Sequence, residues 1–129
     1  MNTVIDAHNI SKVYNPGAIP VYAINDVHLH LEKGEFTALV GPSGSGKTTL
    51  LNLIGGLDKP DKGSVIVNGK DITLLRANEL IDFRLHNIGF VFQSFNLIPV
   101  LTAFENVEFI MLLQGKKKKG KRRKSNPIV

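Results

Sequence analysis

Hydrophobic and polar residues alternate along the first quarter of the chain, and this alternation predicts strands with one buried face. It is imperfect over residues 4–10 and becomes regular towards the end of residues 21–31. In the second of these segments, His28 and His30 fall on the face opposite to the apolar residues. Because no third ligand is near in the sequence, we expect both histidines to face solvent rather than to bind a metal.

Two short apolar runs, residues 35–40 and 88–92, lack this alternation and predict strands that are buried on both faces. Such runs are typical of parallel sheets, so we expect the two segments to lie in one parallel sheet. A third run, residues 64–67, is followed by Asn68-Gly69, a pair that favours a type I′ turn between antiparallel strands. The sequence therefore predicts an α/β fold with an antiparallel edge.

Three further segments have helical patterns. Residues 48–54 place apolar residues on about one face and stop at Gly55-Gly56, where glycine can adopt the left-handed conformation that ends a helix. Residues 76–86 mix apolar with charged residues at helical spacing. The segment Thr102-Ala103-Phe104-Glu105 fits a capping box, which predicts a helix that begins there and reaches Leu113.

A glycine-rich segment joins the run at 35–40 to the helix-like run at 48–54, and it fits the pattern G-x-x-x-x-G-K-[ST]. Glycines let the backbone curl with positive φ, so that several N–H groups approach one anion, and a helix N-terminus adds its own free N–H groups. A chain of this length matches the pattern by chance on the order of 0.4% of the time, which argues against a glycine-rich turn that binds nothing. We therefore predict a phosphate-binding loop made of Gly41, Pro42, Ser43, Gly44, Ser45, Gly46, Lys47, Thr48 and Thr49.

Four side chains have chemistry suited to a nucleoside triphosphate and its metal. Lys47 supplies a mobile positive charge for the β- and γ-phosphates, and the Thr48 hydroxyl is small enough to coordinate Mg²⁺. We expect Thr49 to donate to the α-phosphate. Gln93 directly follows the run 88–92, and such sheets bind ligands at the carboxyl ends of their strands. Its amide oxygen can reach a metal or a water without adding charge, so Thr48 and Gln93 are the predicted metal ligands.

Length and composition fit a single domain. The chain has 129 residues, and 43% of them are hydrophobic, which is enough to bury a core. It has no cysteine, so disulfides and thiolate metal sites are excluded. No apolar run approaches the ~18 residues that span a bilayer, and the amino terminus does not resemble a signal peptide. We expect the chain to be cytoplasmic.

The net charge of +5 is unevenly distributed. Residues 115–124 hold eight of the sixteen Lys and Arg residues, and all eleven acidic residues precede them. The body therefore has eight basic and eleven acidic residues, a net −3, and we expect no specific nucleic-acid site there. The basic tail supports an alternative function, that of a non-enzymatic protein that binds nucleic acid or acidic lipid. The tail has no aromatic residue to stack on bases, which argues against a dedicated single-strand site.

Taken together, these motifs resemble the nucleotide-binding subunit of ABC transporters. Their sequences are most similar to those of the lipoprotein-releasing and macrolide-efflux branch. The resemblance covers residues 3 to about 114. The segments that carry it are residues 41–52, 55–57, 90–99 and 102–107, together with Tyr14, Gly63 and Gly69.

This resemblance implies a P-loop NTPase-like core with an N-terminal antiparallel β subdomain, and Mg-ATP as the ligand. It implies that Tyr14 stacks on adenine, that residues 41–49 bind the triphosphate, and that Gln93 senses the metal and the γ-phosphate while coupling to a permease. The implied partners are an FtsX-like permease and a second nucleotide-binding subunit. Their implied location is the cytoplasmic face of the plasma membrane.

The motifs of the family's second half are missing from the sequence. The LSGGQ-type signature, the acidic Walker B strand with its catalytic glutamate, and the switch histidine are absent from the chain. Glu105 and Glu108 lie on the predicted helix, so neither replaces the general base. We expect residues 1–114 to be the front part of a nucleotide-binding domain, which is an incomplete core. Since this part has no catalytic residue, we expect the chain alone not to hydrolyse ATP.

We expect residues 115–129 to form a basic, disordered tail, because the segment contains a helix-breaking proline and could form no helix with an apolar face. Runs of lysine are encoded by adenine-rich codons, which are prone to gaining or losing a base, and the family resemblance fades at this run. Reading one allowed set of codons one base later gives acidic residues ahead of an apolar stretch, which suits a helix start better. We interpret the tail as out of frame.

Overall fold

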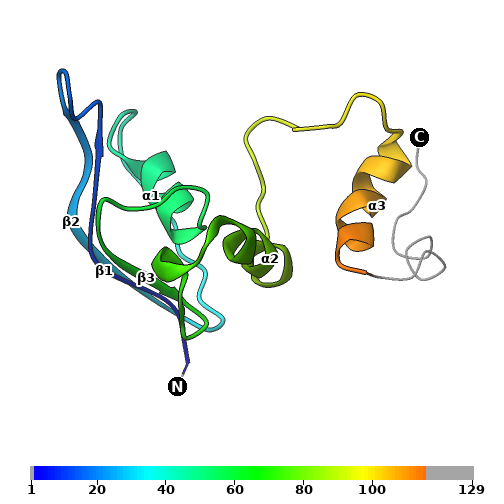
Figure 1. Cartoon of the computed structure of the whole chain (residues 1–129), viewed down its shortest axis with the longest axis horizontal. Helices are drawn as coiled ribbons and strands as arrows, with labels where there is room; N and C mark the ends of the chain where they lie inside the picture. The colour runs from blue at the N-terminus through cyan, green and yellow to red at the C-terminus, as the bar shows by residue number, and fades with distance from the viewer. Residues whose placement is uncertain (1, 116–129) are drawn as a thin grey trace. The chain divides into compact units, whose positions relative to one another are not determined.

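The computed structural model describes residues 2–115 and divides the chain into two compact units, residues 1–80 and residues 81–129 (Figure 1). The basic tail predicted from residue 115 onwards lies, from residue 116, outside the described residues.

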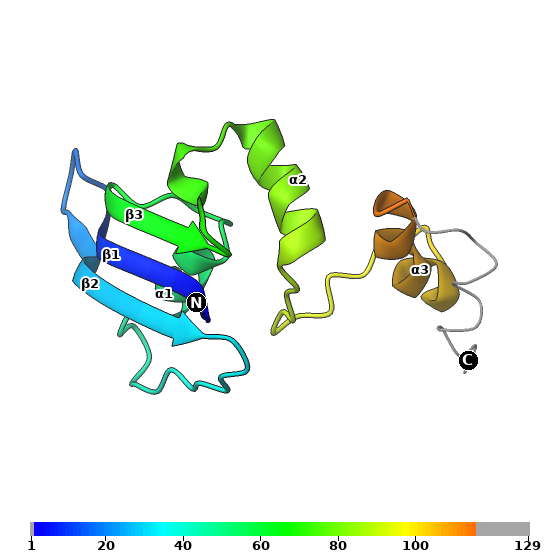
Figure 2. The ribbon, with the colours of Figure 1, turned by 90° about the horizontal axis from the view of Figure 1, so that it is seen from below.

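The first unit is built on an antiparallel sheet with the strand order β2-β1-β3-β4 (Figure 2). Its strands are β1 (Thr3–Tyr14), β2 (Val21–Glu32), β3 (Lys62–Val67) and β4 (Lys70–Asp71). These strands contain the segments 4–10, 21–31 and 64–67, so the two strands predicted from alternation and the antiparallel edge predicted at 64–67 are confirmed. Asn68 and Gly69 between β3 and β4 have φ of 48° and 78°, as a type I′ turn requires.

Helix α1 (Lys47–Ile54) packs against one face of this sheet and confirms the helix predicted after the glycine-rich loop. It ends at Gly55-Gly56, and Gly56 has the left-handed φ of 70° that was expected of a terminating glycine. The 3-10 helix η1 (Ile72–Leu74) and the start of α2 (Ala77–Asn87) follow the sheet. The side chains buried in this core are Ala7, Ile10, Ile24, Leu50, Leu53, Ile54, Val65, Val67, Ile72, Leu75 and Leu80.

The opposite face of the sheet has the polar residues of the alternating pattern. His28 and His30 are exposed, as predicted, and they interact with neighbouring acids and amides rather than with each other. Within residues 2–115 no group of three or more His, Asp or Glu side chains could hold a metal ion. The solvent-facing interpretation of these histidines therefore agrees with the structure.

The two predicted parallel strands are wrong for the chain as it stands. Residues 35–40 and 88–92 form no strand, and Phe36, Val40 and Val91 are fully or almost fully exposed. A strand exists only when its backbone N–H and C=O groups pair with a neighbour. The described residues supply no neighbouring strand to either segment, so both runs remain extended loops (Figure 2).

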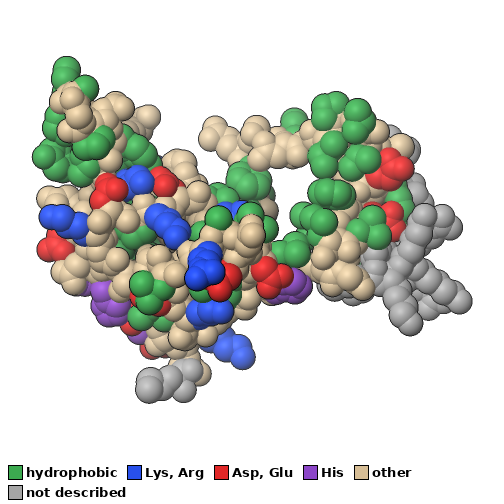
Figure 3. Space-filling model, in the orientation of Figure 1, with side chains coloured by type: hydrophobic (Ala, Val, Ile, Leu, Met, Phe, Trp, Pro, Cys, Tyr) green, Lys and Arg blue, Asp and Glu red, His purple; other side chains and the backbone are tan. Residues whose placement is uncertain are grey.

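The second unit contains the end of α2 and the helix α3 (Ala103–Leu113). The predicted capping box is confirmed: the Thr102 hydroxyl accepts from the Glu105 N–H at 3.2 Å, and the Thr102 N–H donates to the Glu105 carboxylate at 2.8 Å. However, several apolar side chains of α3 are exposed, among them Val107 at 60% and Ile110 at 51%. Figure 3 shows apolar side chains gathered on the surface of α3.

None of the helices formed by residues 2–115 is long and apolar enough to cross a membrane.

Candidate functional site

The glycine-rich loop leads directly into α1, so the predicted turn before a helix is present. Gly44 and Gly46 have φ of 81° and 93°, and the Ser45 N–H donates to the Pro42 carbonyl oxygen at 3.2 Å. A side chain with a Cβ is strained at such φ values, which explains why this tight loop uses glycine. Gly46 also caps α1, and no side chain accepts a hydrogen bond from the first turn of that helix. The free N–H groups there form a site that favours an anion.

Lys47 is the first residue of α1, and its side chain bends back over the loop. Its ammonium Nζ donates to the carbonyl oxygens of Gly41 at 2.5 Å and Pro42 at 2.8 Å. It also reaches the Ser45 hydroxyl at 3.3 Å. These contacts hold a positive charge against the loop, where it could interact with a phosphate group.

A hollow of about 580 Å³ adjoins the loop, which is within the usual size range of small-molecule sites. It brings together most of the predicted site residues, which come from the end of β1 and from the loop 41–49. It also includes three residues of β2 that sequence reasoning missed. The lining consists of Tyr14, Val21, Tyr22, Ala23, Ser43, Gly44, Gly46, Lys47, Thr48 and Thr49.

The missed residues reach the hollow through strand pairing. Tyr14 pairs with Val21 and Val13 pairs with Tyr22 across the β1–β2 ladder. The start of β2 therefore lies beside Tyr14 at the same end of the sheet. Only a correct register would have revealed this neighbourhood, and Asn15-Pro16-Gly17 indicates a turn after Tyr14 without fixing that register.

Tyr14 is held in place by two charged residues. Its hydroxyl donates to Asp58 Oδ2 at 3.3 Å, and the Lys12 ammonium lies 5.6 Å from the centre of its ring. Lys12 also donates to Asp58 Oδ1 at 3.1 Å and to the Lys59 carbonyl oxygen at 2.8 Å. Sequence reasoning missed Lys12 and Asp58, because nothing in their spacing indicates that they meet.

These contacts explain the acidity of Asp58. Partial burial raises the pKa of this carboxyl group, as it does for any desolvated acid. The hydrogen bond and positive charge of Lys12, together with the Lys59 N–H and the Tyr14 hydroxyl, outweigh burial and lower the pKa below its ordinary value. Asp58 is therefore ionised at neutral pH and accepts hydrogen bonds with its full negative charge.

Gln93, the remaining predicted site residue, belongs to the second unit. It lies in a segment without helix or strand, and its side chain is exposed. Because residues 88–92 form no strand, the structure gives Gln93 no place at the carboxyl end of a sheet. The predicted placement of Gln93 at a strand end is thus wrong for the described residues.

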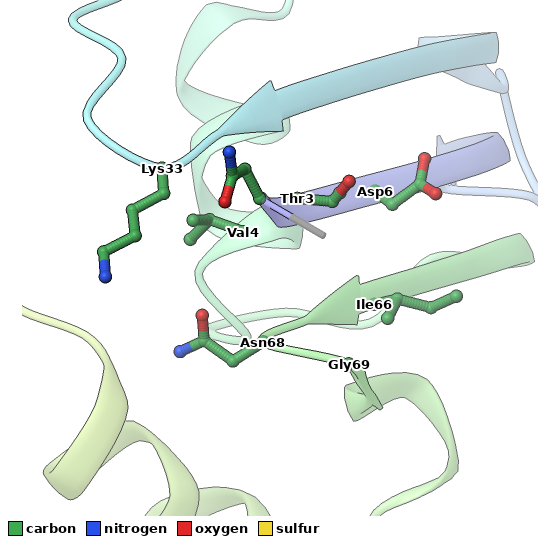
Figure 4. A pocket seen from close by; sticks show the side chains of 8 residues that line it. Thr3, Val4, Asp6, Lys33, Ile66, Asn68 and Gly69 are labelled. Atoms are coloured by element: carbon green, nitrogen blue, oxygen red, sulfur yellow. The ribbon is translucent and has the colours of Figure 1, made fainter.

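A second hollow of about 560 Å³ lies on the outer face of the sheet (Figure 4). Asp6 of β1 and Lys33 after β2 lie at opposite ends of its lining. The lining also contains Asn68 and Gly69 of the β3–β4 turn, but it has no helix N-terminus and no glycine-rich loop. It therefore lacks the features that suit the loop hollow to phosphate.

Comparisons with known proteins agree with this geometry. The family profile described as "ABC transporter" matches residues 24–126 of the chain. The uncharacterized ABC transporter ATP-binding protein MJ0796 of Methanocaldococcus jannaschii is 47% identical over 111 residues, which are 86% of this chain and 47% of that protein. The macrolide export ATP-binding/permease protein MacB of Brucella abortus is 43% identical over 112 residues, 87% of this chain and 17% of that protein.

A solved structure is similar as well. The dimeric post-hydrolysis state of the MJ0796 ATP-binding cassette, bound to ADP and Pi, superposes with a TM-score of 0.86 at 43% identity and covers 92% of this chain and 53% of that one. The chain thus spans about half the length of the relatives that it matches first. This similarity confirms the predicted fold class, an ABC ATPase-like core with an antiparallel β subdomain. The chain belongs to the ABC transporter family and corresponds to part of its ATP-binding domain.

Proposed function

We propose that this chain binds Mg-ATP in the hollow between Tyr14 and the loop 41–49, as an ATP-binding subunit of an ABC transporter. The observation that carries the proposal is the lining of that hollow, which combines an aromatic ring, a glycine-rich loop, a lysine and a helix N-terminus without a side-chain cap. This set of groups is complementary to a nucleoside triphosphate, with an apolar base at one end and negative charge at the other.

The donor set fits the ligand residue by residue. Backbone N–H groups around Gly44 and Gly46 and the Lys47 ammonium would hold phosphate oxygens, and the Tyr14 ring would stack on adenine. The Thr48 hydroxyl lines the same hollow and would be the protein ligand of Mg²⁺. Bound Mg²⁺ would supply neutralisation of the phosphate charge. We further propose Gln93 as a second metal ligand, on the family pattern alone.

The partners follow from the family rather than from this chain. We propose that an FtsX-like permease and a second nucleotide-binding subunit complete the transporter at the cytoplasmic face of the plasma membrane, and that the complete assembly hydrolyses ATP. MJ0796 is dimeric in its solved structures, and MacB combines an ATP-binding part with a permease. Their similarity to this chain supports the proposal.

Isothermal titration of the full chain with ATP and Mg²⁺ tests the proposed site. We expect weak binding, since one subunit offers no opposing surface to enclose the nucleotide, and we expect Lys47→Ala to abolish it. Lys33→Ala is the matched control, because it removes a lysine that lines only the outer-face hollow. Tight binding that survives Lys47→Ala, or loss of binding in Lys33→Ala alone, would overturn the proposal.

A further inference from the structure

Asp58 connects the two ends of the proposed nucleotide site. Its carboxylate accepts from the Tyr14 hydroxyl at 3.3 Å, while its own backbone N–H donates to the Asn52 carbonyl oxygen in α1 at 3.2 Å. The neighbouring Leu57 N–H donates to the same oxygen at 2.8 Å. One short loop is therefore bonded both to the ring at the end of β1 and to the helix that starts in the phosphate-binding loop.

The hydrogen bond between Lys12 and Asp58 is partly buried. The Lys12 side chain is only 14% exposed and the Asp58 side chain 36% exposed. Lys12 is fixed at two points, Asp58 Oδ1 and the Lys59 carbonyl oxygen, and it lies near the Tyr14 ring. A charge-assisted hydrogen bond in such a setting is stronger than a bond between neutral groups.

The Tyr14 ring lies where β1 ends, and the hydrogen bond from its hydroxyl to Asp58 restrains it there. It is 38% exposed at the last position of β1, and the next residues, 15–20, form the tip of the hairpin. A ring that serves as a stacking platform gains affinity when it is already held in its binding position, since less conformational entropy is lost on binding. The phenol group of Tyr14 has one hydroxyl donor, and Asp58 accepts it.

We propose that Asp58 is a positioning residue for the nucleotide base: it orients the Tyr14 ring relative to α1 and so sets the affinity for the adenine part of the ligand, without touching the phosphates. The inference rests on the proposed function, because it takes Tyr14 as the adenine platform. It adds Asp58 to the proposed site and states that this residue contributes to the affinity for the base but not to the affinity for the triphosphate.

The test compares ATP with inorganic tripolyphosphate, which has the phosphates but no base. In the full chain, Asp58→Asn removes the charged acceptor and Tyr14→Phe removes the donor while keeping the ring. Each variant should weaken ATP binding about 2- to 10-fold, the effect of losing one hydrogen bond, and should leave tripolyphosphate binding unchanged. The double variant should lose no more than either single variant, because both substitutions break the same bond.

Asp61→Asn is the matched control in the same loop. Its carboxylate accepts from the Val13 backbone N–H at 2.7 Å, so it ties the loop to β1 without reaching the ring. We expect this variant to lower thermal stability and to leave the ratio of ATP to tripolyphosphate affinity unchanged. If Asp61→Asn lowers that ratio as much as Asp58→Asn does, the effect belongs to the loop as a whole and the inference is wrong.

A spectroscopic measurement reports on the ring directly. The chain has two tyrosines, so [¹³C]tyrosine NMR gives one set of ring signals for Tyr14 and one for Tyr22. Asp58→Asn should shift the Tyr14 signals and leave those of Tyr22 nearly unchanged. Unshifted Tyr14 signals would contradict the contact itself, whether or not nucleotide is present.

The outcomes separate the inference from the function on which it rests. If the unmodified chain binds neither ATP nor tripolyphosphate through Lys47, the proposed function fails and the inference fails with it. If both ligands bind through Lys47 but Asp58→Asn changes neither affinity, or changes both equally, the function stands and the inference alone is overturned.

Discussion

Gly46 and Ala23 lie so close together that a Cβ on Gly46 would stand 2.5 Å from the Ala23 carbonyl oxygen. The same Cβ would meet the Ile24 side chain at 3.1 Å. The glycine-rich loop therefore lies against the backbone of β2, and this close approach is possible because Gly46 has no side chain. The position of the loop depends on β2 as well as on α1.

This contact predicts a strong effect of Gly46→Ala. The substitution combines a backbone φ of 93° with a clash against a carbonyl oxygen, so we expect a loss of about 1–3 kcal/mol of stability and of nucleotide binding. Urea denaturation and ATP titration measure the two effects. Gly17→Ala is the control, because a Cβ there has no heavy atom within 4 Å. Equal stability of the two variants would contradict the close approach.

The sequence predicted correctly those elements whose structure depends only on residues close to one another along the chain. The capping box at Thr102 and the turn at Asn68-Gly69 depend on residues within a few positions, and the structure has both. The strands 35–40 and 88–92 depend on partners elsewhere, and the described residues contain none. An apolar run shows that a segment suits burial, but it does not show that the burying partner is present.

The candidate site divides in the same way. The loop 41–49 was predictable because its spacing encodes its own geometry. The clamp formed by Lys12, Tyr14 and Asp58 was not, since it joins residues 44 positions or more apart through the β1 strand and the loop after α1. Lys12, Tyr14 and Asp58 are residue types common on protein surfaces, and only their contacts in the folded structure indicate that they could hold the Tyr14 ring.

We predict that the purified chain shows no catalytic ATP turnover. Among the described residues of α3, Glu105 is used in the capping box and Glu108 is buried, so neither carboxylate is free to act as a general base. Phosphate release assays should give the background rate of the buffer. Turnover that persists through repurification and disappears with Lys47→Ala would refute this.

The pKa of Asp58 predicts a contribution to stability that depends on pH. Because its folded pKa is lowered, the contribution is complete above the unfolded pKa and is lost as the pH falls through the folded pKa, below about pH 4. The difference in unfolding free energy between the unmodified chain and Asp58→Asn should therefore be largest at neutral pH. Urea denaturation from pH 7 to pH 3 measures it, and a difference that grows towards low pH would contradict the ionised clamp.

The two units should differ in local stability. Every buried apolar residue among those described belongs to residues 1–80, whereas α3 has eleven residues and buries only Glu108. Isolated helices shorter than ~12–15 residues are marginal in water, so the amides of α3 should exchange with solvent faster than those of β1. Hydrogen exchange followed by NMR or mass spectrometry measures this. Equal protection of α3 and β1 would show that α3 is stabilised by contacts other than the burial of its own apolar side chains.

We propose that ATP binds in the hollow beside the loop 41–49 and not in the hollow on the outer face of the sheet. Titration of the ¹⁵N-labelled chain with Mg-ATP, followed by amide NMR, tests it most directly, because each hollow has its own residues. We expect shifts that saturate at Gly44, Gly46, Lys47 and Tyr14, while the signals of Asp6, Lys33 and Asn68 stay unchanged. Saturating shifts at Asp6, Lys33 and Asn68 with an unperturbed loop would contradict it.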